Sequence, residues 1–377
     1  MISCEEILKY AEDNTEAALN LLLELAPIPA PSHHEELRAE FCKKWLESIG
    51  AEGVYIDEAL NVVFPYGDIS GDIKVFMAHS DVVFPDTEPL PLKREDGKIY
   101  CPGIGDDTAH AVTLMMAAKY IVENKPECDN CGILIVINSC EEGLGNLKGC
   151  RHIMEKFGDR VTEFVTFDSH PKFIANGAVG SHRYKIEVKT AGGHSFGNFG
   201  RTNSIAVLAQ LINKLYSVTL PENGRTTYNV GTISGGTSVN TIAQNAEMLY
   251  EYRSNKAENL EYMQNQLAEI VDSFKELDAE ITVTKVGDRP CGSSVDEARH
   301  KELTDKAVKV IEKIYEITPR IGSGSTDCNV PLSMGIPSVC VGCVKSSGAH
   351  TRREYMLEES LEPGIAVALS MINYSLK

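Results

Sequence analysis

Short apolar runs of strand character alternate with longer segments of helical periodicity along most of the chain. The runs at 73–78, 132–138 and 163–167 are rich in β-branched and aromatic residues, and segments with apolar positions at helical spacing, 108–123 and 146–157, separate them. Strands that alternate with helices of this length indicate a largely parallel sheet. The sequence therefore predicts an α/β fold with a mostly parallel central sheet.

The pattern changes between residues 181 and 291. His182–Lys189 alternates between apolar and polar residues, as a strand with one solvated face does. The elements that follow complete the order βαββαβ, which is typical of a ferredoxin-like unit. The first pattern then returns, and a chain of 377 residues is too long for one ordinary core. We expect a discontinuous α/β domain, residues 1–180 and 292–377, with an inserted α+β domain at 181–291.

Local signals predict where two of the helices begin. Ser32 and Glu35 match the capping-box pattern, so we expect a helix that starts there and ends at Gly50. Asn203 is placed to cap the helix at 203–217, because its side-chain oxygen can accept hydrogen bonds from the first backbone N–H groups of that helix.

Charge and hydropathy exclude several classes of partner. The chain has 36 basic and 54 acidic residues, a formal net charge of −18, and this balance repels phosphate backbones and anionic membranes. No stretch approaches the roughly 18 consecutive apolar residues that a membrane span needs. The first residues lack the basic start and apolar middle of a signal peptide. We expect a cytoplasmic protein that binds neither nucleic acid nor membrane.

The eleven cysteines are spread through the chain, which fits reduced thiols better than a disulfide framework. Two Cys-x-x-Cys pairs occur, Cys128/Cys131 and Cys340/Cys343, but they lie too far apart in the chain for the two halves of a zinc ribbon. Cys340 and Cys343 also belong to an apolar run that is typical of a buried strand. We therefore assign no structural metal to these cysteines.

Acidic and histidine residues gather where the predicted strands end. They are His79 and Asp81 after 73–78, Glu141 and Glu142 after 132–138, Asp168 after 163–167, Asp106 and Asp107 after a glycine turn that opens a helix, and His350 beyond a late strand. In open α/β sheets, ligand sites lie at the carboxyl ends of the strands. Histidines and carboxylates bind divalent metal ions, and two adjacent cations need a shared carboxylate. The pattern predicts a carboxylate-rich metal site.

These motifs resemble, in order and spacing, those of the M20 family of dinuclear zinc peptidases over essentially the whole chain. They are His79-Ser80-Asp81, Gly105-Asp106-Asp107, Glu141-Glu142-Gly143, Asp168 and Gly348-Ala349-His350-Thr351. The family includes peptidase T-like aminotripeptidases, dipeptidases, a glutamate carboxypeptidase and several amino-acid deacylases. Its inserted βαββαβ domain serves as lid and dimer surface, so the resemblance implies a catalytic first domain and a homodimer.

The resemblance also implies a role for each residue of the motifs. Five residues would ligate two zinc ions: His79 and Asp168 one ion, Glu142 and His350 the other, with Asp106 bridging both. A cis peptide bond to Asp107 would hold the bridging residue. Asp81 would orient His79, and Glu141 would act as the general base. Cobalt or manganese could replace zinc, because carboxylate-rich sites discriminate poorly between divalent ions.

The inserted domain carries three candidates for contact with the substrate. His194, in a glycine turn, resembles the family's lid histidine, which reaches the substrate carbonyl from the partner subunit. Asn240 resembles the asparagine that contacts the substrate, and Arg253 is a candidate anchor for a carboxylate. An inert turn histidine and a solvated surface arginine are the alternatives for His194 and Arg253.

The substrate is predicted from one ligand and one loop. Asp168 stands where amino- and dipeptidases of the family have aspartate, and Gly324-Ser325-Thr326-Asp327 resembles a peptidase T-like segment. Phe167–Pro171, by contrast, is unlike the glycine-rich segment expected at this place in a tripeptidase. The resemblance therefore implies an aminopeptidase that acts on di- and tripeptides. The alternatives are an N-acyl-amino-acid deacylase or a carboxypeptidase on the same site, and a non-catalytic peptide-binding protein.

Overall fold

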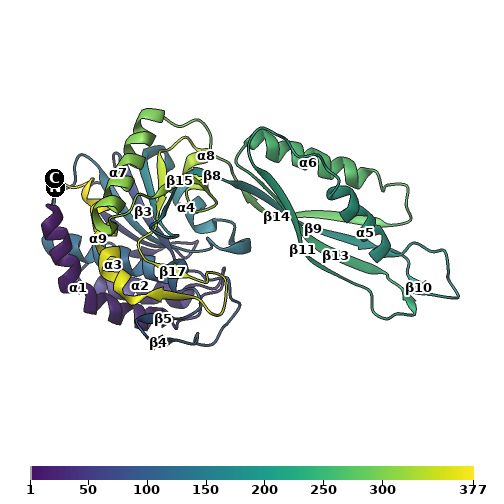
Figure 1. Cartoon of the computed structure of the whole chain (residues 1–377), viewed down its shortest axis with the longest axis horizontal. Helices are drawn as coiled ribbons and strands as arrows, with labels where there is room; N and C mark the ends of the chain where they lie inside the picture. The colour runs from purple at the N-terminus through teal and green to yellow at the C-terminus, as the bar shows by residue number, and fades with distance from the viewer. Residues whose placement is uncertain (1) are drawn as a thin grey trace. The chain divides into compact units, whose positions relative to one another are not determined.

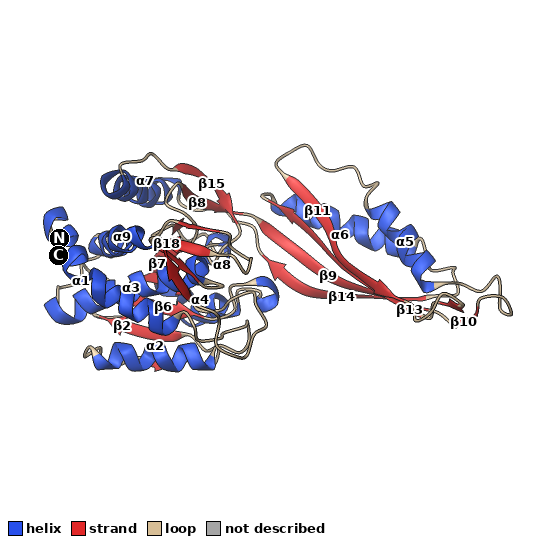
Figure 2. Ribbon diagram, turned by 60° about the horizontal axis from the view of Figure 1, so that its bottom comes forward, coloured by secondary structure: helices blue, strands red, loops and turns tan. Residues whose placement is uncertain are grey.

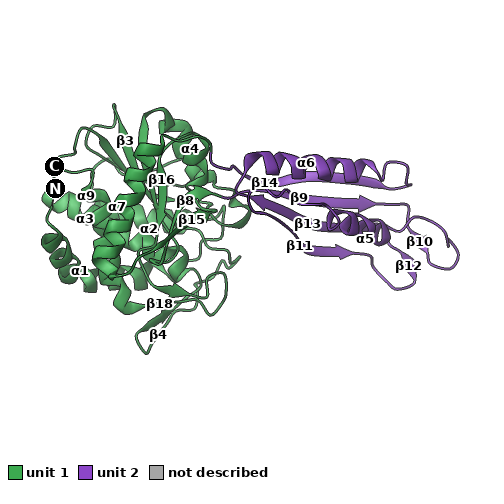
Figure 3. Ribbon diagram, turned by 45° about the horizontal axis from the view of Figure 1, so that its top comes forward, with its two compact units in different colours: residues 1–178, 293–377 green, residues 179–292 purple. Residues whose placement is uncertain are grey.

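The computed structural model describes residues 2–377 and consists of two compact units (Figure 1, Figure 3). The first unit comprises Met1–Ala178 and Ser293–Lys377, and the second comprises Val179–Gly292. The two ends of the chain lie together in the first unit, because the backbone N–H of Ile2 donates to Asn373 Oδ1 at 2.9 Å. The second unit is therefore an insertion in the first.

An eight-stranded sheet forms the centre of the first unit, in the order β1-β2-β6-β3-β7-β16-β8-β15. Its strands are β1 (Tyr55–Ile56), β2 (Val62–Tyr66), β3 (Ile73–His79), β6 (Gly132–Asn138), β7 (Val161–Phe167), β8 (Phe173–Ala178), β15 (Arg320–Gly324) and β16 (Ser338–Val341). Strand β3 pairs in parallel with β6 and β7, and β7 pairs in parallel with β16, whereas β1 and β2 form an antiparallel edge. The predicted α/β fold with a mainly parallel central sheet is confirmed.

Helices cover both faces of this sheet (Figure 2). They are α1 (Cys4–Leu25), α2 (Glu36–Ser48), α3 (Ala109–Asn124), α4 (Lys148–Phe157), α7 (Glu297–Tyr315), α8 (Asn329–Ser333) and α9 (Leu361–Asn373). Phe76 and Ala78 of β3 belong to the core shared with α1, α3, α7 and α9, whereas Val75 and Met77 belong to a second core shared with α4. Both faces of β3 are therefore buried, which is the physical reason for the apolar run from Val75 to Ala78.

A smaller sheet in the first unit holds a loop of the candidate site. Its order is β17-β18-β5-β4, and its strands are β4 (Lys93–Glu95), β5 (Lys98–Tyr100), β17 (Ser346–Ser347) and β18 (Tyr355–Leu357). Strands β17 and β18 pair antiparallel, with Ser347 opposite Tyr355. The loop between them carries His350, so the hairpin positions this residue.

The second unit has a four-stranded antiparallel sheet in the order β11-β13-β9-β14. Its elements are β9 (Gly180–Lys189), α5 (Ser204–Leu215), β11 (Thr226–Gly235), β13 (Asn245–Ser254), α6 (Ala257–Asp272) and β14 (Glu280–Arg289), with two short strands, β10 (Gly193–His194) and β12 (Thr241–Ile242), paired separately. The main elements follow the predicted order βαββαβ. Ile186 and Met248 pack against α5 and α6, which cover one face of the sheet (Figure 2).

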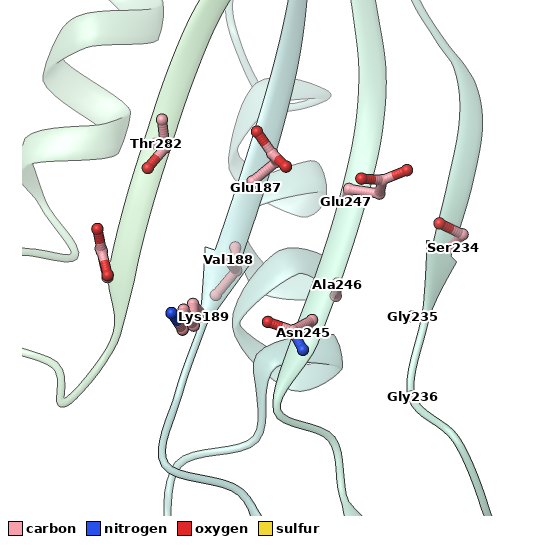
Figure 4. Close-up of a pocket in the computed structure, with 11 residues that line it drawn as sticks. Glu187, Val188, Lys189, Ser234, Gly235, Gly236, Asn245, Ala246, Glu247 and Thr282 are labelled. Atoms are coloured by element: carbon pink, nitrogen blue, oxygen red, sulfur yellow. The ribbon is translucent and has the colours of Figure 1, made fainter.

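The opposite face of this sheet is open and polar. Glu187 and Glu247 lie on neighbouring strands there, over a shallow hollow of about 480 Å³ (Figure 4). Lys185 Nζ lies 2.9 Å from Glu187 Oε1 and 3.0 Å from Glu247 Oε2, so both carboxylates form an ion pair with the same lysine. The alternation of buried and polar residues along β9 and β13 follows from these two environments.

The predicted capping box at Ser32 is wrong. Helix α2 begins at Glu36, and Ser32 Oγ donates to Asp81 Oδ2 at 2.6 Å instead of capping the helix. The Glu35 carboxylate accepts the backbone N–H of Cys140 at 3.0 Å. Both side chains have partners distant in sequence, which a local pattern does not reveal. The predicted cap at Asn203 is confirmed, because its side chain accepts the N–H groups of Ile205 and Ala206.

None of the eleven cysteines forms a disulfide bond in the structure. Cys340 lies on β16, and both it and Cys343 are buried in the first unit. Among residues 2–377, no helix has the length and apolar character needed to cross a membrane.

Candidate metal centre

His79 is the last residue of β3, and its ring is buried. Its Nδ1 atom lies 3.1 Å from the backbone oxygen of Asp81 and 3.4 Å from Asp81 Oδ1, while its backbone N–H donates to Asp107 Oδ2 at 2.8 Å. Two oxygens beside Nδ1 favour a proton on that atom. The lone pair of Nε2 is then available to a metal ion.

Asp106 lies between two histidines. It belongs to the short helical turn Ile104–Thr108, which precedes α3. Its Oδ1 atom lies 3.1 Å from His79 Nε2, and its Oδ2 atom lies 3.1 Å from His350 Nε2. The peptide bond from Asp106 to Asp107 is cis, as the resemblance implies.

His350 and Glu142 meet on the other side of Asp106. His350 has a left-handed backbone conformation, with φ of 62°, and its Nε2 atom lies 3.0 Å from Glu142 Oε1. Glu142 follows β6 after a short turn and is buried. The hairpin β17–β18 and the central sheet thus each supply one side chain to this contact.

Asp168 follows β7 and lies on the His79 side of the cluster. One ligand atom each of His79, Asp107 and Asp168 lie within 4.8 Å of one another, and the same holds for His79, Asp106 and Glu142. Asp107 Oδ2 accepts the backbone N–H of His79 at 2.8 Å, whereas Asp107 Oδ1 lies 2.8 Å from His110 Nδ1 without forming a hydrogen bond. Both Asp107 and Asp168 therefore lie close enough to His79 to contribute to a metal site.

The cluster has the donor chemistry of a divalent metal site. Burial raises the pKa of Asp168, and the negative charge of Asp106 raises it further. Burial also opposes ionisation of Asp106, but its contacts with the rings of His350 and His79 outweigh this effect and lower the pKa of that carboxyl. Crowded buried carboxylates repel one another unless a cation lies between them. Imidazole nitrogens and carboxylate oxygens together fit zinc and similar ions.

Asp81 connects the end of β3 with the end of β6. Its Oδ1 atom accepts the backbone N–H of Glu141 at 2.9 Å, and Oδ2 accepts the N–H of Glu142 at 3.0 Å and the hydroxyl of Ser32 at 2.6 Å. Burial opposes ionisation of Asp81, but its interactions with His79, Ser32 and Glu142 lower its pKa. One buried carboxylate therefore positions both glutamates and the ring of His79.

Two of the candidates in the second unit lie at the same end of its sheet. Strand β10 pairs with β12, with His194 opposite Thr241, and the N–H of Ser195 donates to the backbone oxygen of Asn240 at 3.0 Å. His194 Nδ1 accepts the N–H groups of Phe196 at 3.2 Å and Gly197 at 3.3 Å. These contacts place the ring proton on Nε2.

The structure separates Arg253 from these two residues. Arg253 lies near the end of β13, opposite Ser181, whereas Asn240 precedes the other end of that strand. Its guanidinium group donates to both carboxylate oxygens of Glu251, at 3.0 and 3.2 Å.

A comparison with known proteins identifies the family. The sequence profile of Peptidase family M20/M25/M40 matches residues 75–374, a range that includes all five candidate ligands. The chain belongs to this peptidase family. It is a metal-dependent hydrolase that acts on peptide bonds.

Of two relatives of this M20 peptidase in sequence, one has a name that states an activity and one does not. "Uncharacterized protein YqjE" of Bacillus subtilis is 24% identical over 391 residues, which cover 97% of this chain and 100% of that protein. A succinyl-diaminopimelate desuccinylase of Nitrosomonas eutropha is 27% identical over 224 residues, 54% of this chain and 58% of that enzyme.

Solved structures share the fold. Aminopeptidase PepT of Bacillus cereus has a TM-score of 0.73 at 22% identity, covering 95% of this chain and 98% of that one. A tripeptidase of Staphylococcus aureus has a TM-score of 0.75 at 23% identity, covering 96% and 98%.

Three buried side chains around the centre of this M20 peptidase were missed in the sequence. Glu354 accepts hydrogen bonds from the turn that carries Asp106, and burial raises its pKa to about 7. Arg38 donates to the backbone oxygen of Ser80 at 2.9 Å, and Glu35 accepts the N–H of Cys140. Each is a charged residue in a polar stretch, where sequence patterns predict exposure, so no local signal could have found it.

Proposed function

We propose that this M20 peptidase is a peptidase T-like aminopeptidase that cleaves di- and tripeptides with two divalent metal ions, in the first place zinc. The observation that carries the proposal is the Asp106 carboxylate, whose two oxygens lie 3.1 Å from Nε2 of His79 and of His350. A carboxylate that faces two histidines suits a bridge between two adjacent ions.

The ligands divide between two positions. His79 and Asp168 would hold one ion, Glu142 and His350 the other, and Asp106 would touch both. When bound, such ions lower the pKa of water toward about 7 and stabilise negative charge on a carbonyl oxygen. Cobalt or manganese would suit the same ligands.

Glu141 is the proposed general base. It takes the proton from the attacking water and passes it to the leaving amine. Asp81 holds the backbone N–H groups of Glu141 and of its neighbour Glu142 at 2.9 and 3.0 Å, so base and ligand keep a constant spacing.

The second unit is the proposed lid and the surface of a homodimer. His194, with its proton on Nε2, donates a hydrogen bond to the substrate carbonyl oxygen as negative charge develops there. Asn240 lies beside it and binds polar groups of the peptide. Arg253 is proposed as an anchor for a substrate carboxylate, which would displace Glu251 from its guanidinium group.

A second candidate function uses the same residues on another substrate. The desuccinylase relative favours an N-acyl-amino-acid deacylase, whereas Asp168 and the likeness in fold to PepT support the aminopeptidase. A base together with a full ligand set counts against a non-catalytic binding protein. We also propose a cytoplasmic location, supported by eleven cysteines without disulfide bonds.

The substrate is tested by metal analysis followed by turnover of matched peptides. Free and N-blocked forms of the same di- and tripeptides are compared at equal concentration. We expect cleavage of the free peptides alone, because an aminopeptidase requires the α-amine. Cleavage of the blocked forms alone would establish the deacylase, and cleavage of neither by metal-loaded protein would refute both candidates.

The mechanism is tested by a matched pair of neighbouring substitutions. Glu141→Gln should keep about two metal ions per chain and lose at least roughly 10³-fold in kcat, because it removes the base and no ligand. Glu142→Gln should lose metal. Metal content is measured on the dialysed proteins, and a Glu141→Gln variant as active as the parent would contradict the mechanism.

A further inference from the structure

Glu354 is a buried carboxylate at the edge of the metal centre. It lies four residues beyond His350, directly before β18, and its side chain is directed to the turn that carries Asp106. Its Oε2 atom accepts the N–H of Gly103 at 2.7 Å, and its Oε1 atom accepts those of Gly105 at 2.8 Å and Asp106 at 2.9 Å.

The turn needs this acceptor. Its backbone N–H groups point away from the helix that follows, and Gly103, which precedes it, has no side chain that could accept them. Gly105 also packs closely on the β17 segment, since a Cβ atom at this position would lie 2.2 Å from Ser346 Cβ. Water therefore has little access to these N–H groups, and the Glu354 carboxylate satisfies them.

The backbone of Glu354 is held by hydrogen bonds within the loop that carries His350. The backbone N–H of Glu354 donates to Thr351 O at 3.2 Å, and the N–H of Thr351 donates to Gly348 O at 3.0 Å. The next residue, Tyr355, pairs with Tyr100 of β5. Glu354 thus joins two segments of the chain, one with the proposed bridging carboxylate and one with a histidine ligand.

We infer that Glu354 is a positioning residue, which fixes Asp106 and His350 relative to each other so that the two metal positions form together. The inference rests on the proposed two-metal function. Without the link, the N–H groups of Gly105 and Asp106 lose their acceptor and the bridging carboxylate is no longer held between the two histidines. Residues that orient metal ligands typically affect metal affinity by 10- to 100-fold.

Glutamine cannot replace glutamate here. The two oxygens of Glu354 face N–H groups on both sides, whereas an amide offers one oxygen and one NH₂ group. In Glu354→Gln, the side-chain NH₂ group must face the backbone N–H of either Gly103 or Gly105, and two donors cannot form a hydrogen bond with each other. Glu354→Asp keeps both oxygens but is one methylene shorter, so it should restore part of what glutamine loses.

The test measures metal affinity independently of catalysis. Metal-free parent, Glu354→Gln and Glu354→Asp are titrated with Zn²⁺ in competition with a chromophoric chelator. We expect at least one of the two ions to bind 10- to 100-fold more weakly to Glu354→Gln, with Glu354→Asp in between. The control is Val367→Ala on α9, a substitution of a buried residue that lowers stability and lies outside both the turn and the His350 loop.

Each outcome decides the inference. It is overturned if Glu354→Gln binds both ions as the parent does, or if Val367→Ala weakens binding equally. If the Glu354 variants do not fold, hydrogen exchange of the metal-free parent tests the inference instead. The inference requires that the amides of Gly105 and Asp106 exchange at least roughly tenfold more slowly than unprotected amides, and faster exchange would overturn it. A parent that binds metal but cleaves no peptide would refute the proposed function and leave the inference testable.

Discussion

Asp81 has more influence on the centre than its place outside the ligand set suggests. Its carboxylate accepts hydrogen bonds from the backbone N–H groups of Glu141 and Glu142 and from the hydroxyl of Ser32, and it lies beside the ring of His79. A buried carboxylate with this many donors stays ionised, which agrees with its lowered pKa. Its orientation is therefore set by its donors.

Ser32→Ala tests this dependence at the scale of one hydrogen bond. It removes the 2.6 Å contact to Asp81 Oδ2, so we expect a loss of about 1–2 kcal/mol in the free energy of unfolding. We expect kcat/KM to fall about tenfold, because Asp81 would hold His79 and Glu141 less rigidly. Denaturant unfolding and steady-state kinetics measure the two effects. Ser32→Thr keeps the hydroxyl and should retain kcat/KM, and an unchanged kcat/KM in Ser32→Ala would refute this role.

At the scale of elements, helix α2 is tied to the sheet edge by one buried side chain. Arg38 donates to the backbone oxygens of Ile28 and Ser80, at 2.8 and 2.9 Å, and to Thr108 Oγ1 at 2.9 Å. Its acceptors belong to the proline-rich segment before α2, the end of β3 and the turn before α3. Arg38 therefore holds together three of the elements that surround the centre.

Arg38→Met should destabilise the first unit strongly. The substitution leaves buried carbonyl oxygens without donors, so we expect a loss of about 3 kcal/mol in the free energy of unfolding. Arg94→Met is the control, since Arg94 forms a partly exposed ion pair with Glu358 and should change stability far less. Chemical denaturation followed by circular dichroism measures both. Equal effects of the two substitutions would contradict the role of Arg38.

For the whole molecule, the proposed homodimer makes a prediction about His194. If His194 acts on the site of the partner subunit, a His194→Ala chain and a Glu142→Gln chain each lack a different part. An equimolar mixture should regain about one quarter of the parent activity, because half of the dimers are mixed and each has one complete site. Peptide turnover is measured before and after mixing. Confirmed mixed dimers without activity would show that the site is complete within one chain.

The architecture was predictable from the sequence because burial leaves a local pattern. Strand β3 lies between two cores, so residues 73–78 are apolar except for Lys74, and β9 has one open face, so it alternates. The candidate metal ligands were also recognisable from a local pattern. Acidic and histidine residues directly after apolar runs are conspicuous, and the ends of parallel strands meet at one edge.

Contacts between distant segments could not be predicted in this way. The sequence suggested a helix cap at Ser32, but its hydroxyl donates a hydrogen bond to the carboxylate of Asp81, 49 residues away. Glu354 lies in a polar stretch typical of the surface, yet it is buried and accepts a hydrogen bond from the N–H of Gly103, 251 residues away.

The sequence by itself determined the mainly parallel α/β architecture of this protein and the residue types at the edge of its sheet. Only the tertiary structure decided which oxygen meets which donor: Asp106 between His79 and His350, and Glu354 against the turn that carries Asp106. The physical reason is one of range. Periodicity and burial act within an element, whereas a hydrogen bond is specified by the final positions of two groups from separate parts of the chain.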